Sequence, residues 1–122
     1  MVKNVTSFSR SGLSDFVFQR VSAAIMAVYT LCVLGFFLAN PGLTHADLVS
    51  YFGSTPMLVF STLLILSTAA HAWIGMWTVG TDYIQAHYFG AHATSFRLIY
   101  QAGVVALIFL YVVWALQLFW TL

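Results

Sequence analysis

Long apolar stretches separated by short polar segments dominate the pattern of this chain. Acidic and basic side chains are absent from residues 21–39, 56–81 and 98–122. A helix of about 20 apolar residues crosses the hydrocarbon core of a bilayer, so each stretch is long enough to span a membrane. The pattern therefore predicts an all-α membrane protein with three transmembrane helices.

The predicted helices occupy about residues 17–39, 56–81 and 96–121 of a single membrane domain that covers residues 1–122. Serine or threonine caps are expected before them, at Ser14, at Ser54, and at Thr94 or Ser95. The turn Asn40-Pro41-Gly42 ends the first helix, because proline cannot continue a helix. Thr44 and Asp47 then have the spacing of a capping box, which predicts a short surface helix toward Gly53.

Basic residues lie on one side of the predicted membrane domain. Lys3, Arg10 and Arg20 precede the first span, and Arg97 lies between the second and third. These are all four of the Lys and Arg residues, so the other loop and the C-terminus have none. The positive-inside rule then predicts a cytoplasmic N-terminus and a periplasmic C-terminus.

Composition narrows the class of protein further. Of the 122 residues, 61% are hydrophobic and 6% are charged, whereas roughly a quarter of the residues in soluble domains are charged. The formal net charge of +1 leaves no basic patch to neutralise the phosphates of a nucleic acid. Cys32, the single cysteine, lies in an apolar stretch and is expected to be a small buried or lipid-facing apolar residue.

The second span contains the one ionisable side chain deep in any of the three, His71. An ionisable residue inside a membrane is costly, so it indicates a functional site. With 3.6 residues per turn, one face of this helix combines His71 with other polar or small residues: Ser67, Gly75, Thr78 and Asp82.

Two roles suit a neutral imidazole at this depth: hydrogen bonding to a neighbouring helix, or ligation of a metal, most plausibly haem iron. Both remain open from the residues alone. One histidine cannot complete six-coordinate haem iron, and His45, His87 and His92 lie in the loops. If His71 is a haem ligand, the second axial ligand must come from another chain.

Asp82 and Tyr83 follow His71 by about 16–18 Å along the helix, which places them at the cytoplasmic edge of the membrane. They suit either a solvated helix end with an interfacial aromatic, or a site for a quinone, whose carbonyl needs a neutral donor. Arg20, at the start of the first span, suits either a positive-inside anchor or a partner for an anionic group such as a haem propionate.

The sequence resembles the smaller membrane-anchor subunit (the D subunit) of bacterial succinate dehydrogenase over most of its length. The resemblance rests on Arg10, Gly12, Asp15-Phe16 and Arg20, on the segment 33–37, and above all on the segments 71–77 (HAWIGMW) and 81–83 (TDY). It implies that His71 is one axial ligand of a haem b shared with a cytochrome b556 partner subunit. It also implies that Arg20 lies near the haem propionates, and that Tyr83 binds ubiquinone beside Asp82.

The resemblance further implies a place in respiratory complex II, in a bacterial inner membrane. Succinate would be oxidised on a flavoprotein subunit, and electrons would reach ubiquinone through an iron–sulfur subunit, so the isolated chain is not expected to be active. The segment 85–95 is longer than the corresponding link in the family, and no functional residue is carried over to the third span. The alternatives are the anchor of a fumarate reductase, or a small structural or transport subunit without haem.

Overall fold

The computed structural model describes residues 12–122, and every regular element in this range is helical. In chain order, the elements are α1 (Gly12–Ala39), α2 (His45–Gly53), α3 (Thr55–Tyr83), α4 (Ala86–Phe89), the 3-10 turn η1 (Gly90–His92) and α5 (Ala93–Trp120).

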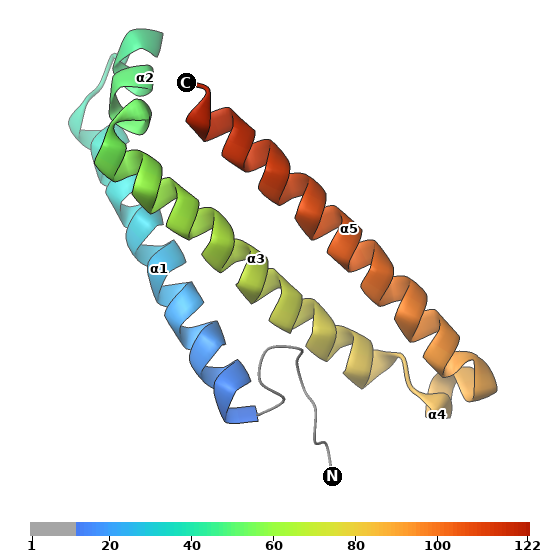
Figure 1. Cartoon of the computed structure of the whole chain (residues 1–122). Helices are drawn as coiled ribbons and strands as arrows, with labels where there is room; N and C mark the ends of the chain where they lie inside the picture. Colours follow the sequence, from blue (N-terminus) through green and yellow to red (C-terminus); the bar gives the residue numbers. More distant parts are fainter. Residues whose placement is uncertain (1–11) are drawn as a thin grey trace.

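The long helix α3 is the centre of the structure. Helices α1 and α5 pack against it from opposite sides, as Figure 1 shows. The short helix α2 and the C-terminus lie at one end of the three long helices, and α4 lies at the other end (Figure 1). Segments near the start of α1, the end of α3 and the start of α5 therefore share one end of the molecule.

The three long helices have the dimensions of membrane spans. They contain 28, 29 and 28 residues, which corresponds to about 42 Å each and exceeds the roughly 30 Å of a hydrocarbon core. Within residues 12–122, these are the three helices long and apolar enough to cross a membrane. The expected all-α architecture with three spans is confirmed, and the chain is a multi-pass membrane protein.

Two of the expected helix caps are wrong. Helix α1 already includes Gly12, so Ser14 lies inside the helix rather than before it. Helix α5 begins at Ala93, so Thr94 and Ser95 lie in its first turn. The reason is that η1 runs directly into α5: His92 has helical backbone angles, with φ −89° and ψ −1°, and leaves no extended residue to act as a cap.

The other helix starts agree with the expectation. The Thr44 hydroxyl accepts a bond from the Asp47 amide at 3.2 Å, and the Asp47 carboxylate accepts one from the Thr44 amide at 2.9 Å, which completes the capping box of α2. Ser54 precedes α3, with Pro56 in the first turn. Its hydroxyl, however, donates to the Tyr51 carbonyl at 2.9 Å instead of capping the helix.

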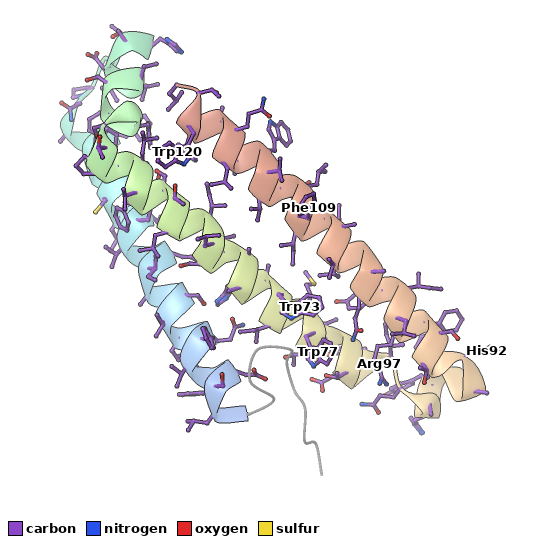
Figure 2. All side chains as sticks on the ribbon, viewed as in Figure 1. Trp73, Trp77, His92, Arg97, Phe109 and Trp120 are labelled. Carbon is purple, nitrogen blue, oxygen red and sulfur yellow. The ribbon has the colours of Figure 1, made fainter. Side chains whose placement is uncertain are left out.

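Small and hydroxyl-bearing residues fill the contacts between the long helices. Tyr29 of α1 and Ser61 of α3 share a hydrogen bond of 2.7 Å, and Ser61 is completely buried. On the other side of α3, the Trp120 indole donates to the Thr62 hydroxyl at 2.9 Å and fastens the end of α5 (Figure 2). Small side chains let helix backbones approach closely in a membrane, where hydrophobicity alone does not drive association.

Candidate functional site

His71 lies on α3 where this helix packs against α1. Its Nδ1 atom is 3.0 Å from the hydroxyl of Ser22, in the buried part of α1, and the two form a hydrogen bond. The Ser22 hydroxyl also donates to the backbone carbonyl of Gln19 at 3.1 Å. The imidazole is half-buried, and its second ring nitrogen, Nε2, has no hydrogen-bond partner among residues 12–122. Of the two roles left open by the sequence, hydrogen bonding to a neighbouring helix is confirmed for Nδ1.

Two buried polar atoms of residues near Ser22 and His71 in the sequence have no hydrogen-bond partner among residues 12–122. They are the side-chain oxygen of Gln19, three residues before Ser22, and the indole N–H of Trp77, six residues after His71. A buried donor or acceptor without a partner costs about 1–3 kcal/mol. Gly75 brings the backbone of α3 close to the same glutamine, since a Cβ added there would lie 3.9 Å from Gln19 Nε2. The α1–α3 contact around His71 therefore includes the polar side chain of Gln19 as well as the Ser22–His71 hydrogen bond.

The residues of the polar stripe expected on α3 differ in burial along the helix. Ser67 is buried, His71 and Gly75 are half-buried, and Thr78 and Asp82 are exposed. The Thr78 hydroxyl donates to the Ile74 carbonyl of its own helix at 3.0 Å rather than to a neighbouring helix. The stripe therefore starts in the contact with α1 and ends on the surface.

Asp82 and Tyr83 end α3 and are both exposed, Tyr83 by 68%. The next carbonyl, that of Ile84, accepts two hydrogen bonds from the Arg97 guanidinium, from Nη2 at 2.7 Å and from Nε at 3.3 Å. Figure 2 shows Arg97 at the start of α5, beside the end of α3. Because a cation is favourable at a helix C-terminus, Arg97 stabilises the end of α3 that carries Asp82 and Tyr83.

Arg20 lies on α1, two residues before Ser22 and so about 3 Å from it along the helix axis. Its side chain is exposed, and the guanidinium carbon lies 4.6 Å from the centroid of the Phe16 ring. This cation–π contact keeps the charge on the surface of α1. Arg20 and His71 thus belong to the same end of the α1–α3 pair, while Tyr83 lies beyond them at the end of α3.

The other histidines stay apart from His71. His45 begins α2 at the opposite end of α3, and His87 and His92 lie in α4 and η1, where their rings contact Tyr88 and Phe96. No group of three or more His, Cys, Asp or Glu side chains suited to a metal ion occurs within residues 12–122. Among the described residues, no other histidine therefore lies beside His71.

Two residues of this region, Ser22 and Arg97, acquire site contacts that the sequence did not predict. Ser22 is a polar residue inside an otherwise apolar span, and such residues usually face the interior of a helix bundle. That signal could have identified Ser22 as buried, but not its partner. In the sequence, Arg97 is explained by the positive-inside rule alone, so it gave no sign of a contact with Ile84. That contact forms because η1 turns the chain from α4 into α5.

Comparison with known proteins identifies the family of this chain. Residues 3–114 match the model of a family described as the succinate dehydrogenase/fumarate reductase transmembrane subunit. The succinate dehydrogenase hydrophobic membrane anchor subunit of Coxiella burnetii is 32% identical over 112 residues, which are 92% of this chain and 91% of that protein. The chain belongs to the succinate dehydrogenase/fumarate reductase family of transmembrane subunits, and is a membrane-anchor subunit of that family.

Proposed function

We propose that this chain is the membrane-anchor subunit of a succinate:ubiquinone oxidoreductase, respiratory complex II, in a bacterial inner membrane. In this assignment it contributes one axial ligand of haem b and part of the ubiquinone site. The observation that carries it is His71, a half-buried imidazole in a spanning helix with Nδ1 bonded to Ser22 and Nε2 left without a partner on the described chain.

The residues around His71 suit a haem shared between two subunits. His71 would be the axial ligand from this chain, with the second from the cytochrome b556 anchor subunit, since the described residues offer no second histidine nearby. Arg20 is exposed on the same stretch of α1, which is compatible with a contact to an anionic propionate. When bound, haem b would supply a one-electron carrier within the membrane.

The end of α3 suits the quinone site. The Tyr83 hydroxyl is a neutral donor on an exposed surface and would hold a quinone carbonyl, while Asp82 would pass protons from water to the reduced quinone. Arg97 steadies this end through the Ile84 carbonyl. With the N-terminus and α4 on the cytoplasmic side, the site would face the iron–sulfur subunit, which relays electrons from the flavoprotein where succinate is oxidised.

The test of haem ligation is His71→Leu in the assembled complex, with His45→Leu as the matched control at the opposite end of the molecule. We expect His71→Leu to perturb or abolish the reduced-minus-oxidised spectrum of the b-type haem, because imidazole ligation from this chain is lost. The control should keep it. An unchanged spectrum in the His71 variant would contradict haem ligation by His71.

A second candidate is the anchor of a fumarate reductase, because the matching family includes transmembrane subunits of both enzymes. Such an anchor would serve the reverse electron path with a quinone of lower potential. Many anchors of that kind lack haem, so a haem on His71 favours the dehydrogenase. Steady-state rates of the purified complex with ubiquinone as acceptor and with a reduced menaquinone analogue as donor separate the two.

A further inference from the structure

The hydroxyl of Ser22 takes part in two hydrogen bonds at once. It lies 3.1 Å from the carbonyl oxygen of Gln19 and 3.0 Å from Nδ1 of His71. A hydroxyl has one proton to donate, and a carbonyl can only accept. Both bonds therefore form together only if Ser22 donates to Gln19 and accepts from an Nδ1–H of His71.

This hydrogen-bond arrangement determines which tautomer the neutral His71 ring adopts. In a neutral imidazole one nitrogen carries the proton and the other carries a lone pair. With the proton on Nδ1, the lone pair is on Nε2, the nitrogen that has no partner on the described chain. Ser22 is only 5% exposed, so water does not compete readily for its oxygen.

We infer that Ser22 is a positioning residue that holds His71 in the Nδ1–H tautomer, with Nε2 directed to act as the iron ligand. The inference rests on the proposed haem ligation and deepens it. Metal-binding histidines generally donate their second N–H to a fixed acceptor, which orients the ring and makes the ligating nitrogen more basic. Here the acceptor comes from a different helix, so the packing of α1 on α3 also sets the strength of the ligand.

Removing the hydroxyl should weaken and alter the ligand without removing it. In Ser22→Ala, the Nδ1–H loses its acceptor, the ring loses its fixed orientation and Nε2 becomes a poorer electron donor. Loss of such a partner typically lowers metal affinity by about 10–100-fold. We therefore expect weaker haem retention during purification. The midpoint potential of the remaining haem should rise, because a poorer donor stabilises ferric iron less.

The experiment uses the complete complex and compares Ser22→Ala with Ser22→Thr, which keeps a hydroxyl. Ser61→Ala is the matched control, since it removes another buried hydroxyl bond between α1 and α3, to Tyr29 at 2.7 Å. The readouts are haem content, the EPR g-values of the ferric haem, and its midpoint potential in a redox titration. Packing damage alone would affect Ser61→Ala as much as Ser22→Ala.

A raised potential and altered g-values in Ser22→Ala, with wild-type values in Ser61→Ala, support the inference. If Ser22→Ala loses its haem completely, haem retention in Ser22→Thr supports it and loss in Ser22→Thr overturns it. Unchanged potential and g-values in Ser22→Ala at full haem content also overturn it. His71→Leu distinguishes failure of the proposed haem ligation from failure of the role of Ser22. A normal haem spectrum in His71→Leu overturns ligation by His71. A lost spectrum in His71→Leu, with unchanged haem properties in Ser22→Ala, overturns only the role of Ser22.

Discussion

Single hydroxyl groups join α1 to α3 at two depths, through the Ser22–His71 bond and the Tyr29–Ser61 bond. Hydrogen bonds between helices in a membrane contribute about 0.6 kcal/mol on average. Bonds of that size add little to the total stability of the fold. Their larger effect is to define how the two helices are rotated against each other, and hence where the His71 ring lies.

Tyr83 offers the clearest test of the quinone site at the level of one residue. Tyr83→Phe keeps the ring but deletes its hydroxyl, a net loss of about 0.5–1.5 kcal/mol for a neutral hydrogen bond, or about two- to tenfold in quinone affinity. We expect a higher KM for ubiquinone, with normal haem content and normal succinate oxidation by an artificial acceptor. Unchanged quinone kinetics would leave Tyr83 as an interfacial aromatic residue.

Gly80 is a position at which a side chain of α5 packs directly against the backbone of α3. A Cβ added there would meet the Tyr100 ring at 2.9 Å, and the Tyr100 hydroxyl is itself bonded to the Met76 carbonyl at 2.9 Å. The ring cannot move aside freely, so Gly80→Ala should destabilise the α3–α5 contact by about 1–3 kcal/mol, as overpacking does. Thermal unfolding of the detergent-solubilised complex measures this.

Gly103→Ala is the matched control, because a Cβ at that position of α5 meets nothing within 4 Å. Alanine is favoured over glycine in a helix by about 0.5–1 kcal/mol, so this variant should be neutral or slightly stabilising. Equal effects of the two substitutions would contradict the close contact at Gly80.

At the level of elements, specific contacts also join the ends of the helices. Helix α2 is fastened to α1 by stacking of the Phe36 and Tyr51 rings, whose centroids are 3.7 Å apart. At the other end, Arg97 bonds the Ile84 carbonyl after α3. These contacts at the helix ends add to the Ser22–His71 and Tyr29–Ser61 hydrogen bonds within the spans.

The start of α2 is expected to depend on pH. Hydrogen bonds from the backbone and then the side chain of Thr44 lower the pKa of Asp47 below its ordinary value. A group with a lowered folded pKa adds stability above its unfolded pKa, about 3.9 for aspartate, and this stability is lost as the pH falls through the folded pKa. We therefore expect the rate of amide hydrogen exchange in residues 45–48, corrected for intrinsic rates, to stay constant with pH around neutrality. The corrected rate should rise below about pH 4. In Asp47→Asn, these amides should already exchange faster at neutral pH, and the further rise below about pH 4 should be absent. A rise that persists in the variant would mean that a group other than Asp47 causes it.

On the scale of the whole molecule, α3 separates α1 from α5 (Figure 1). Both outer helices carry exposed apolar side chains, such as Leu31 and Phe109. Such faces need lipid or another subunit against them. The proposed sharing of haem and quinone sites with a partner subunit would require exposed faces of this kind.

Topology is the prediction that belongs to this scale. Lys3 and Arg10 precede α1 in the sequence, Arg20 lies near the start of α1, and Arg97 lies near the start of α5. The end of the molecule where α1 and α5 begin should therefore be cytoplasmic. A periplasm-active reporter fused after Leu122 should be active, and the same reporter inserted near His87 inactive; a cytoplasm-active reporter should give the reverse. The opposite pattern would contradict both the orientation and the docking side of the catalytic subunits.

The amino-acid sequence by itself determined the number of spans and the α2 capping box. It could do so because the length of an apolar stretch decides what crosses a bilayer, and a cap is a local pattern of a few residues. The orientation, haem ligation and quinone site remain predictions from sequence and resemblance.

Only the tertiary structure decided which side chain meets His71, how Arg97 reaches Ile84, and that α1 and α5 start without the expected caps at Ser14, Thr94 or Ser95. The physical reason is that the spans are apolar around most of their circumference, so periodicity does not show which face of α1 turns toward α3. That rotation follows from the fit of small side chains and from a few hydrogen bonds between residues far apart in the chain, such as Ser22 and His71.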